Sequence, residues 1–151
     1  GSRTTVGEYQ PSPPLTESAI TLPAAGTDAD VPLVVLDLAG NPIYYASHQC
    51  FITPGAIFLV VFNLVDGPNV SDVSHWLQQA HQACSARVAQ DEPAIILVGT
   101  YSDDKNLDEQ QVQQRVEQVT EQYPRYRHRH LKGVVAVSCK NGKGVPELKE
   151  L

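Results

Sequence analysis

Three uninterrupted apolar runs constrain the fold of this chain more than any other feature. They are Ala56–Leu64, Pro93–Gly99 and Gly133–Ser138, and each ends at a polar loop. Apolar runs of this length are typical of strands that are buried on both faces of a parallel sheet. Segments with helical periodicity, Val70–Gln90 and Leu107–Tyr123, separate them. The alternation predicts an α/β fold with a doubly wound, mostly parallel sheet.

The segments before the first run predict an antiparallel hairpin at the edge of this sheet. Ser18–Leu22 and Val31–Asp37 are its expected strands, the second of them buried, and a turn-forming Ala-Gly-Thr-Asp segment joins them. Residues 3–17 are rich in Pro, Ser and Thr and are expected to be a loop, because proline fixes φ and removes a hydrogen-bond donor. Leu38–Pro54 is expected to be a loop followed by a short irregular helix, and Val145–Leu151 begins a final helix.

Charge and composition exclude several classes of function. The formal net charge of −6 gives no general basic field that would attract nucleic acid or an anionic membrane. The one basic cluster, Arg125–His130, is interpreted as a solvated loop or as a patch that docks a partner. No apolar run approaches the roughly 18 residues that a membrane-spanning helix needs. The pair Gly1-Ser2 is interpreted as a cloning scar, so the domain is expected to cover residues 3–151.

The cysteines predict a reducing environment. Cys50, Cys84 and Cys139 are an odd set without CxxC spacing, which argues against a disulfide framework and against a zinc site. Cys50 and Cys139 lie in or beside apolar segments. We therefore expect both to be reduced core residues of a cytoplasmic protein.

The first candidate site residues follow the strand Val31–Asp37, in the segment Asp37-Leu38-Ala39-Gly40. The carboxylate of Asp37 could hold Mg²⁺ through water, and the N–H of Gly40 could approach a terminal phosphate because no side chain obstructs it. Asp-x-x-Gly is also good turn chemistry, so this motif alone does not decide between the two interpretations.

The second candidate segment, Thr100-Tyr101-Ser102-Asp103, follows the run Pro93–Gly99. A carboxylate at Asp103 could accept two hydrogen bonds from the N1–H and the exocyclic amine of guanine, which adenine cannot supply in that arrangement. The alternative is that Asp103 caps the following helix.

The third candidate segment, Ser138-Cys139-Lys140, follows the last apolar run. Small residues at this point would let backbone N–H groups reach the carbonyl of a base, and Lys140 could cover a ring face. A plain turn is the alternative, because Asn141-Gly142 comes next. The carboxyl ends of parallel strands meet at one edge of a sheet, so all three segments are expected to contribute to one nucleotide pocket.

These motifs carry a family resemblance. The stretch from Val35 to Leu64, with its His-Gln-x-Phe-Ile-Thr segment, resembles the Roc domain of ROCO proteins, the Ras-like GTPase module of leucine-rich repeat kinases and their relatives. Thr100 at the head of the base-recognition motif is also similar to Roc, and Thr4-Thr5-Val6-Gly7 resembles the Roc switch I region. The resemblance implies a P-loop NTPase type of fold that binds GTP or GDP with Mg²⁺. It also implies a COR-type neighbouring domain.

The resemblance has three important departures. One is Tyr101-Ser102, where most relatives have His or Lys next to the Thr, although Tyr101 could still lay its ring against the purine. No Gly-x-x-x-x-Gly-Lys-(Ser/Thr) sequence, which would cradle the phosphates, occurs in the 151 residues. The resemblance places this loop, together with the first strand and helix, before Arg3. Asn41 occupies the place where Ras-like enzymes use Gln to orient the attacking water, and Asn has a shorter side chain.

The resemblance predicts a guanine-nucleotide-binding switch that regulates a larger signalling protein and hydrolyses GTP slowly. In this hypothesis Asp37 and Thr5 bind the metal, and Gly40 contacts the terminal phosphate. The base is bound by Thr100, Asp103 and Ser138–Lys140. The alternative is a GTPase-like scaffold used for association. Without the first strand, the sheet would have unpaired backbone groups beside an apolar gap, which predicts a homodimer or a segment-swapped assembly.

Overall fold

The computed structural model describes residues 13, 15–23, 30–48, 50–52, 56–67, 70–85, 94–122 and 130–151. The chain divides into two compact units, residues 1–51 and 52–151. The elements in chain order are β1 (Leu15–Pro23), β2 (Asp30–Leu38), η1 (Pro42–Tyr44), α1 (Tyr45–His48), β3 (Ile57–Asn63), α2 (Val70–Ser85), β4 (Ala94–Thr100), α3 (Glu109–Gln122), β5 (Leu131–Ala136) and α5 (Val145–Glu150).

The first unit is the predicted antiparallel hairpin with a short helical segment. Strands β1 and β2 pair over their full lengths, from Leu15 opposite Leu38 to Pro23 opposite Asp30. Strand β1 begins at Leu15, so the end of the predicted loop 3–17 belongs to a strand. The prediction that the second strand is buried is wrong: Val34, for example, is 67% exposed. A two-stranded ribbon has no second layer of its own to cover its faces.

The second unit contains a parallel sheet in the order β3-β4-β5. Ile57 lies opposite Ala94 and Asn63 opposite Thr100, so β3 and β4 end at the same level. Strand β5 continues this edge, with Ala136 opposite Gly99. The three polar loops that follow these strands therefore leave the sheet at one edge, as the sequence predicts for its second and third candidate segments.

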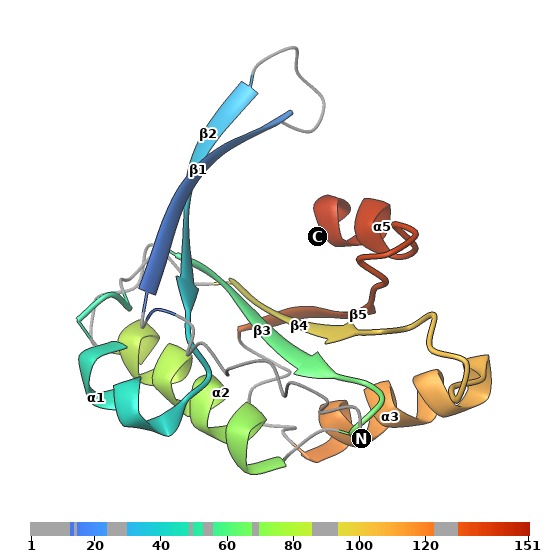
Figure 1. The fold of residues 1–151 in the computed structure, drawn as a ribbon. Helices are drawn as coiled ribbons and strands as arrows, with labels where there is room; N and C mark the ends of the chain where they lie inside the picture. The colour runs from blue at the N-terminus through green and yellow to red at the C-terminus, as the bar shows by residue number, and fades with distance from the viewer. Residues whose placement is uncertain are drawn as a thin grey trace, which may run out of the picture. The chain divides into compact units, whose positions relative to one another are not determined.

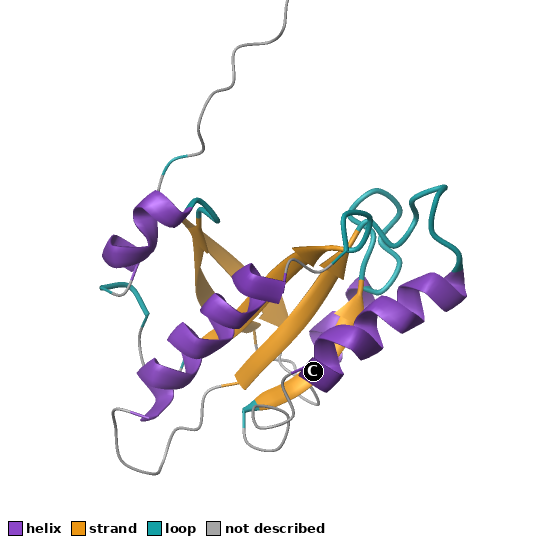
Figure 2. Cartoon of the chain, turned by 90° about the horizontal axis from the view of Figure 1, so that it is seen from below, coloured by secondary structure: helices purple, strands orange, loops and turns teal. Residues whose placement is uncertain are grey.

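Alternating side chains of β4 enter two separate layers of core. Ile95 and Leu97 pack with α2 and α3 in a cluster that includes Leu77 and Val119. Ile96 and Val98 face the opposite side and pack with Val137, Val145 and Leu148, the last two from α5. Figures 1 and 2 show α2 and α3 on one side of this sheet and α5 on the other. The doubly wound arrangement follows from this period of two.

Strand β3 is not buried on both faces, which corrects the sequence-based prediction. Val60 and Phe62 join the core beneath the sheet, whereas Ile57, Leu59 and Val61 are 62%, 52% and 59% exposed. Within the described part of the second unit, β3 is an edge strand, and α5 packs on the side chains of β4 and the segment after β5. No described helix covers the outer side of β3.

Two further expectations have clear outcomes. Cys50 and Cys139 are exposed free thiols, so the prediction that they are core residues is wrong. Both lie in turns beyond the apolar segments that suggested burial.

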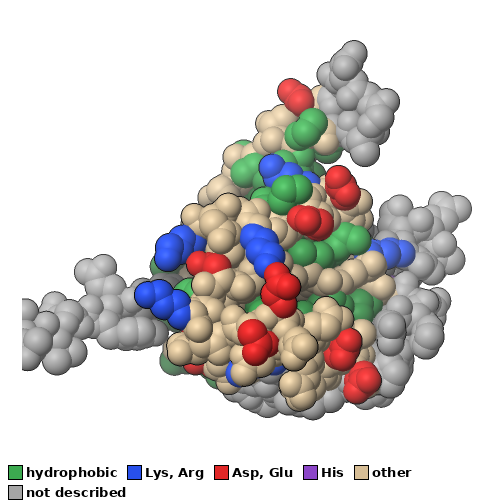
Figure 3. Space-filling view, turned by 90° about the vertical axis from the view of Figure 1, so that its right-hand side faces the viewer, with side chains coloured by type: hydrophobic (Ala, Val, Ile, Leu, Met, Phe, Trp, Pro, Cys, Tyr) green, Lys and Arg blue, Asp and Glu red, His purple; other side chains and the backbone are tan. Residues whose placement is uncertain are grey.

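The basic cluster Arg125–His130 lies outside the described residues except for His130. On the face drawn in Figure 3, acidic and basic side chains are interspersed among uncharged ones.

Candidate functional site

The loop after β4 is anchored at its first residue. The carbonyl of Thr100 accepts a hydrogen bond from Leu64 N–H at 3.1 Å, and its hydroxyl donates to the carbonyl of Phe62 at 3.1 Å. Thr100 therefore ties the end of β4 to the end of β3. Its side chain has a positioning role within the chain, and the predicted ligand contact of this residue stays a prediction.

Asp103 is not the cap of the following helix. Helix α3 begins at Glu109, and Asp108 accepts a hydrogen bond from Gln111 N–H at 2.7 Å. The Gln111 side chain in turn accepts from Asp108 N–H at 2.9 Å. This reciprocal pair is a capping box, and it satisfies two backbone donors at the helix start. The helix is thus capped by Asp108.

The two neighbouring carboxylates, Asp103 and Asp104, differ in their hydrogen bonding. One oxygen of Asp104 accepts from both the backbone N–H and the side-chain amide of Asn106, each at 2.9 Å. Asp103 is half-buried, and its carboxylate makes no hydrogen bond or ion pair with the described part of the chain. A half-buried acceptor without a partner is available to a ligand with matching donors.

The loop after β5 is a tight turn built on Ser138. This residue is fully buried, and its hydroxyl oxygen accepts from Lys140 N–H at 3.2 Å and Asn141 N–H at 3.3 Å. Ser138 is therefore a turn-forming residue. Among the described residues, the N–H of Cys139 has no partner and Lys140 is exposed. These two positions are the ones that a ligand can reach.

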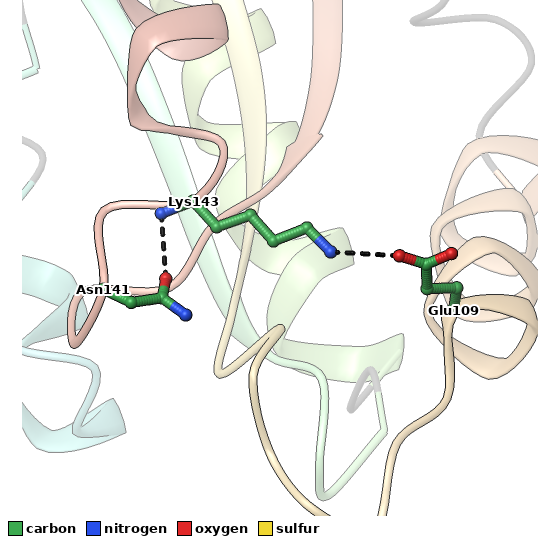
Figure 4. Close-up of polar contacts among 3 residues, drawn as sticks. All are labelled: Glu109, Asn141 and Lys143. Carbon is green, nitrogen blue, oxygen red and sulfur yellow. Dashed lines mark hydrogen bonds and ion pairs between the residues drawn. The ribbon is translucent and has the colours of Figure 1, made fainter.

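Glycine and an ion pair hold this turn in place. Gly144 adopts a φ of +77°, and a Cβ there would overlap the carbonyl oxygen of Ala136. Lys143 N–H donates to the side chain of Asn141 at 2.9 Å, and the Lys143 ammonium lies 3.4 Å from the carboxylate of Glu109 (Figure 4). Both charged groups are largely exposed, so this pair contributes at most about 1 kcal/mol.

The structure brings the second and third candidate segments together. Ser102 N–H donates to the carbonyl of Val137 at 3.2 Å, and Val137 N–H donates to the carbonyl of Gly99 at 2.7 Å. These bonds extend the pairing of β4 and β5 beyond the strands. Asp103 and Cys139 come shortly after these hydrogen-bonded residues. The Asp103 carboxylate and the Cys139 N–H, neither of which has a hydrogen-bond partner among the described residues, therefore belong to adjacent loops.

The remaining candidate residues lie in the first unit. Asp37 is exposed in β2, opposite Thr16. A Cβ on Gly40 would meet no atom within 4 Å, so the space beside this glycine is open. Thr5 lies outside the described residues. No group of three or more His, Cys, Asp or Glu side chains suited to a metal occurs among the described residues, so a cation at Asp37 would need other ligands, such as water or phosphate.

Asn41 has a structural role in the first unit. Its side-chain oxygen accepts from Ile43 N–H at 3.1 Å and caps the helix η1. This bond holds the side chain at the start of η1, so a water molecule could be oriented only by its remaining lone pair or its amide donors. The Tyr45 hydroxyl donates a further hydrogen bond to the carbonyl of Gly40 at 3.3 Å, which links the two ends of residues 40–45.

The sequence interpretation missed two features of the site. The capping box was readable in advance, since Asp108 and Gln111 have the required spacing. The conformation of Tyr101, with a φ of +63°, had no signal in the sequence because residues that favour positive φ are Gly, Asn and Asp.

Comparison with known proteins identifies relatives over most of the chain. The Ras family model matches residues 13–147. The chain is 36% identical over 121 residues to the probable serine/threonine-protein kinase pats1 of Dictyostelium discoideum, covering 80% of this chain and 4% of that protein. It is 32% identical over 123 residues to the probable serine/threonine-protein kinase roco6 of the same organism, covering 80% and 5%.

A solved structure has the same fold. It is the structure of Methanosarcina barkeri Roco2 RocCORdC bound to GDP, which matches with a TM-score of 0.57 and 15% identity. The match covers 99% of this chain and 39% of that one. The chain thus spans about a twentieth of the two kinases and well under half of the Roco2 chain. The predicted Ras-like fold is confirmed.

Proposed function

Because the chain belongs to the Ras family and is a Roc-type domain of it, we propose that it is a guanine-nucleotide-binding switch of a larger signalling protein. In this proposal it binds GTP or GDP with Mg²⁺, and slow hydrolysis of GTP releases the loops that the terminal phosphate orders. The GDP named in the Roco2 structure is the same class of ligand.

The single observation that carries the proposal is the unengaged carboxylate of Asp103. It lies in a loop that is hydrogen-bonded to the segment of the Ser138 turn, and that turn carries the Cys139 N–H, which has no partner among the described residues. Guanine presents two donors and a carbonyl oxygen on one edge. The carboxylate matches the donors and the N–H matches the carbonyl, whereas adenine offers no such pattern. In this proposal the exposed side chain of Lys140 covers a ring face.

The candidate residues for the phosphates and the metal belong to the first unit. Asp37 would bind Mg²⁺ through water, with Thr5 as a second oxygen ligand, and the open space at Gly40 would admit the terminal phosphate. Asn41 would take part in hydrolysis with a short side chain that already caps Ile43. This supports a slow reaction.

A second candidate function is a GTPase-like scaffold that acts by association. The observation in its favour is the apolar outer side of β3, where Ile57, Leu59 and Val61 are exposed. An edge strand with such a side is a ready template for pairing with another segment. We propose that a second copy, an exchanged segment or a COR-type neighbour covers it, in a cytoplasmic setting suited to the free thiols of Cys50 and Cys139.

The proposed function is tested by a substitution at Asp103 that should change which base the site prefers. We expect Asp103→Asn to weaken GDP binding on the order of 100-fold, because one of two charge-assisted acceptors becomes a donor. The same variant should bind xanthosine diphosphate better, since the Asn amide can donate to the additional carbonyl of xanthine. NMR titration with GDP, ADP and xanthosine diphosphate, each with Mg²⁺, detects binding up to millimolar dissociation constants.

Asp104→Asn is the matched control, because it removes the same charge one residue away and retains an acceptor for Asn106. It should leave the preference for GDP unchanged. Equal GDP binding by the wild type and the Asp103→Asn variant would overturn the assignment of the base site. Absence of any guanine preference in the wild type would favour the scaffold.

A further inference from the structure

Three consecutive carbonyl oxygens in the segment after β2, those of residues 40–42, have hydrogen-bond partners within that segment. The carbonyl of Gly40 accepts from the Tyr45 hydroxyl at 3.3 Å, and the carbonyl of Asn41 accepts from Tyr44 N–H at 3.0 Å. The carbonyl of Pro42 accepts from Tyr45 N–H. The three oxygens are therefore directed into the segment and not toward an approaching ligand.

The backbone donors of the same residues have the opposite arrangement. The N–H groups of Gly40 and Asn41 have no hydrogen-bond partner in the described part of the chain, and Pro42 has no N–H. Gly40 and Asn41 are both exposed, and a Cβ on Gly40 would meet no atom within 4 Å. A segment whose acceptors are bonded and whose donors are unpaired is suited to an anion, because successive N–H groups carry positive partial charge.

The Tyr45 hydroxyl controls the orientation of one peptide group in this segment. In a planar trans peptide the C=O and the following N–H point in opposite directions. The bond to the carbonyl of Gly40 therefore turns the N–H of Asn41 away from Tyr45. Without this bond the peptide could rotate and present its oxygen, which would repel an anion.

The ring of Tyr45 packs beside the histidine of α1. Its centroid lies 6.4 Å from that of His48, whose side chain is 2% exposed. The ring of Tyr44 also lies beside His48, at 6.2 Å, but its hydroxyl has no hydrogen-bond partner among the described residues. Two half-buried tyrosines thus contact one histidine, and the hydroxyl of Tyr45 is the one that bonds to Gly40.

We infer that Tyr45 is a positioning residue for the terminal phosphate of GTP, which binds the N–H groups of Gly40 and Asn41. The inference rests on the proposed function. It adds Asn41 N–H as a second donor and Tyr45 as the residue that keeps the intervening carbonyl away from the phosphate. GDP has no third phosphate, so Tyr45 should affect the binding of GTP and not that of GDP. Asp103, by contrast, acts on the base and so on both nucleotides.

Two matched substitutions test the hydroxyl. Tyr45→Phe retains the ring beside His48 and removes the bond to Gly40. It should weaken binding of the non-hydrolysable GTP analogue GppNHp roughly 3- to 10-fold, as expected for one neutral hydrogen bond, and leave GDP binding unchanged. Tyr44→Phe is the control, because it removes a hydroxyl without a described partner from the neighbouring ring. It should bind both nucleotides like the wild type.

NMR titration of the 151-residue chain with GppNHp or GDP, each with Mg²⁺, gives the two affinities. GppNHp should also shift the amide signals of Gly40 and Asn41 more than GDP does. Thermal unfolding without nucleotide completes the comparison, and both variants should melt like the wild type, because a bond of 3.3 Å is long for a hydroxyl donor.

Equal weakening of GppNHp and GDP binding by Tyr45→Phe would overturn the inference, because the hydroxyl would then have a structural role. Melting of this variant well below Tyr44→Phe would overturn it for the same reason. Unchanged GppNHp binding by Tyr45→Phe, with the effect of Asp103→Asn on GDP intact, would overturn the inference and leave the proposed function standing. Absence of a guanine preference in the wild type would refute the proposed function, and the inference with it.

Discussion

Ser102 donates its backbone N–H to the carbonyl of Val137 at 3.2 Å, and this bond joins the loop after β4 to the loop after β5. The two residues are far apart in the sequence but leave adjacent parallel strands at the same edge of the sheet. The bond lies between the residues that the sequence indicates for base recognition. Its presence explains why Asp103 and Cys139 belong to one candidate site.

The two aspartates before α3 should differ in their effect on stability. Asp108→Ala removes the helix cap and should lower the free energy of unfolding by about 1 kcal/mol. Asp103→Ala should leave it within about 0.5 kcal/mol, because no described residue depends on that carboxylate. Urea denaturation followed by circular dichroism measures both. A loss of stability in the Asp103 variant equal to that in the Asp108 variant would contradict the assignment of the cap.

The two serines of the candidate site should respond in opposite directions to the same change. Ser138→Ala removes the acceptor of two backbone N–H groups in a buried turn, and should cost about 1–2 kcal/mol. Ser102→Ala removes a buried hydroxyl without a partner, and should be neutral or stabilise by up to about 1 kcal/mol. Chemical denaturation of the two variants side by side tests this. Similar losses in both would show that the Ser102 hydroxyl has a partner in solution.

Glycines 142 and 144 provide a test of how tightly the second loop packs. Both have positive φ, +78° and +77° respectively, so alanine is strained at either position by about 1 kcal/mol. At Gly144 the added Cβ also overlaps the carbonyl oxygen of Ala136, whereas at Gly142 it meets open space. Gly144→Ala should therefore cost ~3 kcal/mol in total. Equal melting temperatures of the two variants would refute the close packing against β5.

The exposed side of β3 should control self-association. Leu59→Glu places a charge on the apolar surface formed with Ile57 and Val61, and should shift the chain toward monomer in sedimentation equilibrium. Gln118→Glu is the matched control, since it adds the same charge at an exposed position of α3. An assembly that persists in the Leu59 variant, or a wild-type chain that is entirely monomeric, would contradict the proposal that a second copy covers β3.

Most of the strands and the candidate segments could be predicted from residues that are neighbours in the sequence. The apolar runs identified β3, β4 and most of β5, because burial in a sheet selects a continuous apolar segment. Their polar ends identified Asp103 and the Ser138 turn as candidates, and the motif order indicated the family to which the chain belongs. These features depend on residue types that are close together along the chain.

Which candidate groups are available to a ligand depends on how the segments fold and pack. An aspartate can cap a helix, close a turn or remain free, and the choice depends on where the helix begins and which backbone donors lie nearby. The structure assigns these roles to Asp108, Asp104 and Asp103 in turn. It likewise decided that the outer side of β3 is exposed, because coverage of a strand depends on the elements that pack beside it and not on its own sequence.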